Sequence, residues 1–129
     1  MSQKPKEPSH ELGQQARQRY LDQARTVIGE SDLSYTAVYQ RFAQNDWAAM
    51  QLDKSIAEAA LKNGISAKEV VETLHQGPYI QYQVHQKKVP KQVMTQYAKG
   101  LVIQELYKLQ QRQKTQQPNR QQQTGIELE

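Results

Sequence analysis

The sequence predicts an all-α protein, a small bundle of four or five helices with a disordered tail at each end. Three observations favour this class. Apolar residues recur at i, i+3, i+4 and i+7 in several stretches, glycine or proline separates those stretches, and serine or asparagine stands where helices would begin. One short stretch alternates with the period of a strand, but no second stretch offers it a partner. A β-sheet is therefore not expected.

The 129 residues have room for one domain with flanking segments. Residues 1–10 carry two prolines and no apolar periodicity, which predicts a flexible segment. The periodic stretches predict a helical domain over residues 11–109. Residues 110–129 are rich in glutamine, which accounts for 23 residues of the whole chain, and predict a disordered tail. The final Leu-Glu resembles a cloning scar, and the chain is interpreted as a fragment of a longer protein.

Two helices are expected in the first third of the domain. Residues 11–28 have one apolar stripe, and Gly29 is suited to end that helix because glycine tolerates a left-handed backbone. A short helix should follow, capped by Ser31, Asp32 or Ser34. Its apolar side consists of Tyr35, Val38, Tyr39 and Phe42.

The third helix should run from Asn45 to about Asn63 and form the centre of the core. Its apolar positions are Trp47, Met50, Leu52, Ile56, Ala59, Ala60 and Leu61. Because Trp47 stands near the start of a helix with Met50 behind it, we expect the indole to be a core anchor.

Residues 61–79 hold the clearest local signals. Gly64 is suited to end the third helix, and Ser66 with Glu69 has the spacing of a capping box, in which each side chain binds a backbone amide of the other. A fourth helix should therefore run from Ser66 to about Gln76. Gly77-Pro78 ends it.

The alternating apolar residues lie in the stretch 79–89, which we expect to be an extended loop or a loose helical turn. Pro90 suits the first turn of a last helix, because proline lacks only an amide that is unpaired there. That helix should continue to Leu109. Its wide apolar stripe consists of Val93, Met94, Tyr97, Ala98, Leu101, Val102, Leu106 and Leu109.

Composition excludes several classes of function. The chain has no cysteine, so disulfides and thiolate metal sites are excluded, in agreement with a cytoplasmic location. No apolar run reaches the length of a membrane span, and no signal-peptide pattern begins the sequence, so no membrane partner is expected. The formal charge of +4 favours approach to polyanions and is also common among ordinary soluble domains.

No catalytic or cofactor-binding constellation is visible. The histidines His10, His75 and His85 lack metal-ligand spacing, and His75 is expected to be a structural cation in the last turn of a helix. Carboxylates such as Asp53 and Glu58 ordinarily form a solvated helical face. The glycines are scattered and form no phosphate loop, so neither an enzyme nor a cofactor is predicted.

The best candidate for a contact surface lies in residues 79–99. Its lysines meet at the loop and the start of the last helix, and its tyrosines stand just before them. Lysines contact phosphates and aromatic rings stack on exposed bases, so this combination is typical of nucleic-acid binding. The more common alternative is that the lysines only solubilise a loop while the tyrosines pack inward. The candidate contact residues are Tyr79, Tyr82, Lys87, Lys88, Lys91 and Lys99.

The order of these signals resembles a known helical region near the C-terminal end of plasmid mobilisation relaxases and of plasmid- and phage-type replication primases. In that region a helix ends in a Lys/Arg-x-Gly turn, a Ser-capped helix follows, and after a Ser-Pro break comes a helix beginning with Tyr-Ala. Here Gly77-Pro78 replaces Ser-Pro, and a longer connection precedes Pro90. The similarity covers about residues 46–109. The residues that carry it are Asp53, Ile56, Ala57, Ala60, Leu61, Gly64, Ser66, Glu69, Val70, Leu74, Gly77, Pro78, Tyr97, Ala98, Leu101 and Val102.

The resemblance implies a non-catalytic accessory module that binds DNA or organises a DNA-processing complex in mobilisation or replication. A relaxase cleaves with a tyrosine and a histidine cluster on a metal, and this chain lacks that cluster. The nuclease or primase would then lie elsewhere in a longer polypeptide, and the partners would be DNA and that catalytic domain or another protein of the complex. The alternative is a helical protein-interaction module without nucleic-acid contact. Tyr35, Tyr39, Phe42 and the stripe ending at Leu109 would supply its apolar patch.

Overall fold

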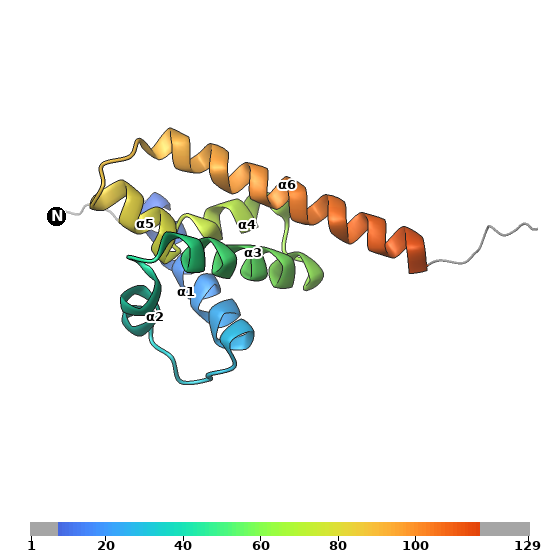
Figure 1. Ribbon diagram of the computed structural model, residues 1–129, viewed down its shortest axis with the longest axis horizontal. Helices are drawn as coiled ribbons and strands as arrows, with labels where there is room; N and C mark the ends of the chain where they lie inside the picture. The colour runs from blue at the N-terminus through green and yellow to red at the C-terminus, as the bar shows by residue number, and fades with distance from the viewer. Residues whose placement is uncertain (1–7, 117–129) are drawn as a thin grey trace, which may run out of the picture.

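The computed structural model describes residues 8–116, and the side chains of residues 13–112. The described residues form six α-helices and no strand (Figure 1). The all-α class is confirmed, with one helix more than the four or five expected. The helices are α1 (Pro8–Ile28), α2 (Tyr35–Phe42), α3 (Asp46–Lys62), α4 (Ala67–Leu74), α5 (Pro78–His85) and α6 (Lys91–Gln116).

Helix ends lie where glycines and small polar residues predicted them. Gly29 and Gly64 adopt φ angles of +87° and +85°, the left-handed conformation that closes a helix. Ser34 is the residue that caps α2, since its Oγ accepts a hydrogen bond from the Ala37 amide at 3.1 Å. The Ser66 Oγ likewise accepts from the Glu69 amide at 3.2 Å. The reciprocal half of the box differs, because the Glu69 carboxylate binds the Ser66 hydroxyl and not its amide.

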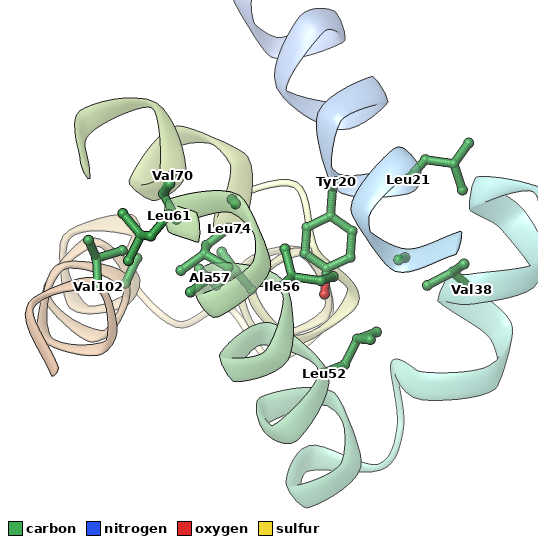
Figure 2. Packing of buried hydrophobic residues seen from close by; sticks show 14 of the residues in the cluster. Tyr20, Leu21, Val38, Leu52, Ile56, Ala57, Leu61, Val70, Leu74 and Val102 are labelled. Carbon is green, nitrogen blue, oxygen red and sulfur yellow. The ribbon is translucent and has the colours of Figure 1, made fainter. Parts of the chain in front are cut away.

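The core is centred on α3, as the sequence predicted, and receives side chains from every other helix. Tyr20 of α1, Ile56 of α3 and Leu74 of α4 are fully buried in it (Figure 2). Trp47 was wrongly placed there: 73% of its surface is exposed. The buried positions of α3 recur at helical spacing from Ala49, and that register puts Trp47 on the opposite side.

Residues 78–85, expected to be a loop or a loose turn, form the regular helix α5. Pro78 stands at its start, where a missing amide costs nothing. Ile80 and Gln83 are buried, and the Gln83 amide donates to the Asp46 carboxylate at 3.1 Å. The alternation of apolar residues did not predict this helix, because Gln83 occupies part of its buried face.

Helix α6 lies along one side of the bundle and contacts α3, α4 and α5 (Figure 1). Met94, Ala98 and Val102 are buried, whereas Val93, expected in the same stripe, is 50% exposed. The helix continues to Gln116, so residues 110–116 are helical and not tail, and α1 begins at Pro8. Residues 1–7 and 117–129 lie outside the described residues. None of the described helices is both long and apolar enough to cross a membrane.

Candidate functional site

Two lysines of α6 line an open groove between α1, α4 and α6, with a volume of about 520 Å³. We call it the lysine groove. Lys91 and Lys99 contribute from α6, and Lys68 contributes from α4. Its other lining residues are Gly13, Ala16, Val71, Glu72, His75 and Gln76. The structure thus brings together two of the predicted contact residues with a third lysine distant in sequence.

The lysines of this region have no carboxylate partner in the described part of the chain. Lys68, Lys91 and Lys99 are exposed and form no ion pair there, and the same holds for Lys87 and Lys88 in the loop before α6. Most other cations are paired with a carboxylate: Arg19, Arg25, Arg41, Lys62, Lys108 and Arg112. Positive charge without local compensation therefore collects beside the groove and the loop.

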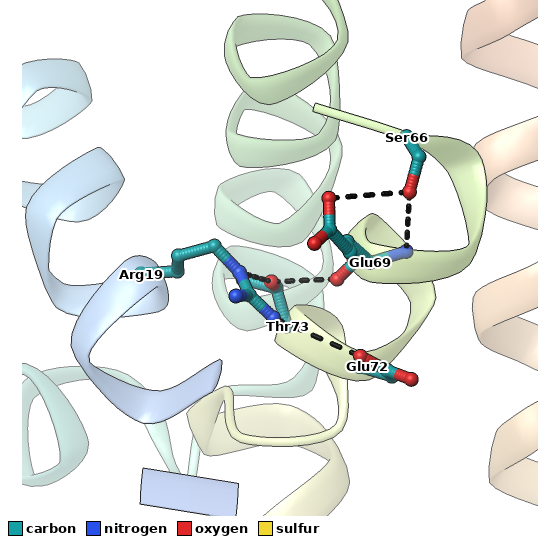
Figure 3. A network of polar contacts seen from close by, with 5 residues as sticks. All are labelled: Arg19, Ser66, Glu69, Glu72 and Thr73. Carbon is teal, nitrogen blue, oxygen red and sulfur yellow. Dashed lines mark hydrogen bonds and ion pairs between the residues drawn. The ribbon is translucent and has the colours of Figure 1, made fainter. Parts of the chain in front are cut away.

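The single carboxylate among the described lining residues, Glu72, is held by α1. Its Oε1 lies 3.8 Å from Arg19 Nη2 (Figure 3). Arg19 also donates through Nε to the Thr73 hydroxyl at 2.9 Å, and that hydroxyl donates to the Glu69 carbonyl at 2.7 Å. This network fixes α4 against α1, and it offsets part of the negative charge at the groove.

His75 connects the two walls of the groove. Its Nε2 lies 3.0 Å from the Thr95 Oγ1 on α6. The Thr95 Oγ1 also lies 3.1 Å from the Lys91 carbonyl, and a hydroxyl that donates its one proton there can accept from a protonated Nε2. Burial and the nearby Lys91 ammonium both lower the pKa of His75. The imidazole is therefore neutral at pH 7, and the structural cation expected from sequence is wrong.

The predicted tyrosines do not line the lysine groove. Tyr79 is half-buried, and its ring centroid lies 4.9 Å from that of Tyr97 in a tilted arrangement. Burial is also the main cause that raises the pKa of Tyr79. Tyr82 is partly buried and lies near Tyr39 of α2, whose pKa is raised by burial first and by Tyr82 second. The Tyr79 ring packs against the core, as in the alternative in which the tyrosines pack inward.

The loop of residues 86–90 presents Lys87 and Lys88 to solvent. Lys88 has a φ of +59°, a left-handed conformation, and the Val89 amide donates to the Gln83 carbonyl at 2.9 Å. This tight turn brings both lysines next to Lys91, the first residue of α6. Of the predicted contact lysines, Lys91 and Lys99 line the groove, whereas Lys87 and Lys88 do not.

A second polar centre lies inside the core and consists of Asp53, Tyr20 and Tyr97, which we call the Asp53 cluster. Asp53 is fully buried, and its two carboxylate oxygens accept from the Tyr20 hydroxyl at 2.7 Å and from the Tyr97 hydroxyl at 2.8 Å. Burial raises its pKa to about 7, and the two hydrogen bonds only partly oppose that rise. Through these two hydrogen bonds the carboxyl joins α1, α3 and α6. It has no exposed surface and is therefore not accessible to a ligand.

The two carboxylates considered from sequence thus differ in surroundings. Glu58 is partly exposed and pairs with Lys62 and Arg112, each at 3.2 Å, which lowers its pKa. It belongs to the solvated face that the sequence predicted, whereas Asp53 does not. In the part of the chain that the structure describes, no group of three histidine, aspartate or glutamate side chains is placed to hold a metal.

Sequence reasoning missed Lys68 and the groove position of His75. Lys68 lies 23 residues before Lys91, and no local pattern links the two. Only the packing of α4 on α6 brings them to one groove.

Comparisons with known proteins add no family. No protein-family model matches the chain, and neither the curated proteins nor the solved structures gave a match.

Proposed function

We propose that this chain is a non-catalytic DNA-binding module, the accessory part of a relaxase-like or primase-like protein of plasmid mobilisation or replication. One observation carries the DNA-binding part. Five exposed lysines without a carboxylate partner in the described residues collect at the lysine groove and the loop 86–90: Lys68, Lys87, Lys88, Lys91 and Lys99. The assignment to a mobilisation or replication protein rests on the sequence resemblance.

The geometry suits phosphate contacts better than base recognition. Lys91 and Lys99 are eight residues apart on one helix, about 12 Å along its axis. Ammonium groups at such a spacing contact different phosphates of one backbone, and each displaces a condensed counterion. Binding should therefore be weakly dependent on sequence and strongly dependent on salt.

Fluorescence anisotropy with labelled single- and double-stranded oligonucleotides tests this proposal. The variant Lys91→Gln/Lys99→Gln should lower the slope of log affinity against log salt by about 1.4 for a single strand or about 1.8 for a duplex. The matched control is Arg41→Gln/Lys62→Gln, which removes the same charge from residues paired with Glu30 and Glu58. If the two variants have equal slopes, the lysine groove is not the contact surface. If the unmodified chain binds no oligonucleotide at low salt, the function is wrong.

Lys87→Gln/Lys88→Gln is the second test variant, because both lysines lie in the loop and outside the groove lining. It should weaken binding to every sequence by a similar factor, since lysines act on phosphates. Tyr79→Phe should leave affinity unchanged because that ring packs on Tyr97.

A protein-interaction module is the second candidate function, and exposed apolar side chains favour it. Trp47 is 73% exposed, and on the outer side of α6 Ile103 and Tyr107 are 66% and 61% exposed. These differ from the patch expected at Phe42 and Leu109, which pack partly against the core. Light scattering after size exclusion would reveal self-association. An apolar contact should persist at high salt, whereas DNA binding should not.

A further inference from the structure

Arg17 of α1 forms a second cationic feature, at the side of the molecule where α1, α2 and α5 meet. Its guanidinium carbon lies 4.4 Å above the centroid of the Tyr35 ring. Its Nε donates to the Gln76 side chain at 3.2 Å. Arginine has five N–H donors, and the four on its terminal nitrogens have no protein partner in the described residues. A stacked guanidinium with free terminal donors is well suited to bind a phosphate with two hydrogen bonds.

A hollow lined by Arg17 and Tyr35, which we call the hollow over Tyr35, adjoins the lysine groove. It has a volume of about 580 Å³, and it shares Gly13 and Gln76 with the groove as lining residues. A smaller hollow of about 160 Å³ also joins them, because His75 and Lys91 line both it and the groove, and Gln81 and His85 line both it and the hollow over Tyr35. The adjoining hollows therefore mark a path from Lys99 to Arg17.

The described residues that line this path favour an anion. Glu72 is the carboxylate found among the described lining residues of the groove, and it is held by Arg19. The hollow over Tyr35 is lined by no carboxylate in the part of the chain that the structure describes. Glutamine side chains, whose amides donate hydrogen bonds, fill much of its wall.

We propose that Arg17, stacked on Tyr35, is a second phosphate contact for the same nucleic-acid strand that the lysine groove holds. The strand follows this path, with the lysines at one end and Arg17 at the other. This inference rests on the proposed function and extends it to residues on α1 and α2 that lie far from the lysines in sequence. The exposed His85 lies between the lysines and Arg17 and would then lie beside the strand.

The test compares thymidine oligonucleotides of about 4 and about 12 nucleotides, the lower and upper parts of the usual range for such sites. With the long oligonucleotide, Arg17→Gln should lower the salt slope by about 0.7, the value for one contact to a single strand. With the short one, which the lysine groove alone can hold, the variant should equal the unmodified chain. Arg17→Lys keeps the charge and should restore most of the slope.

Arg41→Gln is the matched control, because Arg41 is exposed, lies on α2 and pairs with Glu30 outside the path. The inference is overturned if Arg17→Gln and Arg41→Gln have the same effect on the long oligonucleotide, or if Arg17→Gln weakens both lengths equally. Thermal unfolding of each variant, monitored by circular dichroism, shows whether the change acts through the fold. If Arg17→Gln is destabilised, the salt slope of Arg17→Lys, which keeps the charge, decides whether Arg17 contacts the strand. If the unmodified chain binds neither length, the proposed function fails as well, which is a distinct result.

Discussion

Replacing Asp53 with asparagine should remove a pH dependence of stability that the native chain has near neutrality. Asp53 is fully buried, and its pKa rises from an ordinary 3.8 to about 7 in the folded state. The fold therefore favours the protonated carboxyl. Its contribution to stability is fully present below the unfolded pKa and is lost as the pH rises toward 7.

The size of the effect follows from that rise. Each pKa unit corresponds to about 1.4 kcal/mol, so the free energy of unfolding should fall by roughly 3–4 kcal/mol between pH 4 and pH 8 through Asp53 alone. Domains of this size are stable by about 5–15 kcal/mol in total, so the loss is readily measured. The Asp53→Asn variant should show no such fall, because the amide that replaces the carboxyl does not titrate in this range.

Urea unfolding monitored by circular dichroism at pH 4, 5, 6, 7 and 8, at fixed ionic strength, measures both proteins. The quantity to compare is the difference between native and Asp53→Asn stabilities, because groups common to both then cancel. His75 is one such group. Because folding lowers its pKa, stability falls as the pH drops below the pKa of His75 in the unfolded chain. This pH dependence is opposite in sign to that of Asp53. If the two stability curves run parallel from pH 4 to pH 8, the assignment of Asp53 is refuted.

Three further changes test the packing around this centre and at the surface. Gly77→Ala should destabilise by about 1–3 kcal/mol in urea unfolding, because a Cβ there would lie 2.5 Å from a ring atom of Tyr20, which the core and Asp53 hold in place; a neutral result would show that the ring can move. Ser66→Ala should cost about 1 kcal/mol through the lost cap of α4, with Ser66→Thr as the control that retains a hydroxyl. Trp47→Ala should change stability by less than about 0.5 kcal/mol, since the indole is 73% exposed, and a larger loss would place it in the core after all.

Local signals predicted most of the helix boundaries because each depends on a few adjacent residues. Ser34, Gly64 and Ser66 act through backbone atoms within four positions, so their roles are readable from the sequence. Helix α5 was missed since its buried face includes Gln83, whose burial is offset by a hydrogen bond to Asp46, 37 residues away. No periodicity of apolar residues reports such a bond.

The residues of the candidate site likewise divide into those that local sequence predicts and those that only packing brings together. Lys91 and Lys99 share one helix and could be grouped from sequence, whereas Lys68 and Arg17 join them only through the packing of α4 and α1. Asp53 was the hardest residue to predict. Its partners lie 33 and 44 residues away. When those partners are not known, the sequence assigns a carboxylate at this position to a solvated face.

The buried cluster and the lysine groove are linked through α6. Tyr97 stands two residues before Lys99, and its hydroxyl binds the Asp53 carboxylate at 2.8 Å, so the cluster fixes the segment that carries the groove lysines. Tyr97→Phe should therefore destabilise more at pH 8, where it removes a hydrogen bond to a charged carboxylate worth about 1.5–3 kcal/mol, than at pH 5.

On the proposed DNA binding, the effect of Tyr97→Phe should differ in kind from that of Lys99→Gln. A displaced helix weakens binding without removing a phosphate contact, so Tyr97→Phe should lower affinity at every salt concentration with an unchanged slope, whereas Lys99→Gln should flatten the slope. If neither variant flattens the slope, Lys99 contacts no phosphate. A flattened slope in Tyr97→Phe would mean that the Asp53 cluster determines how many lysines reach the strand.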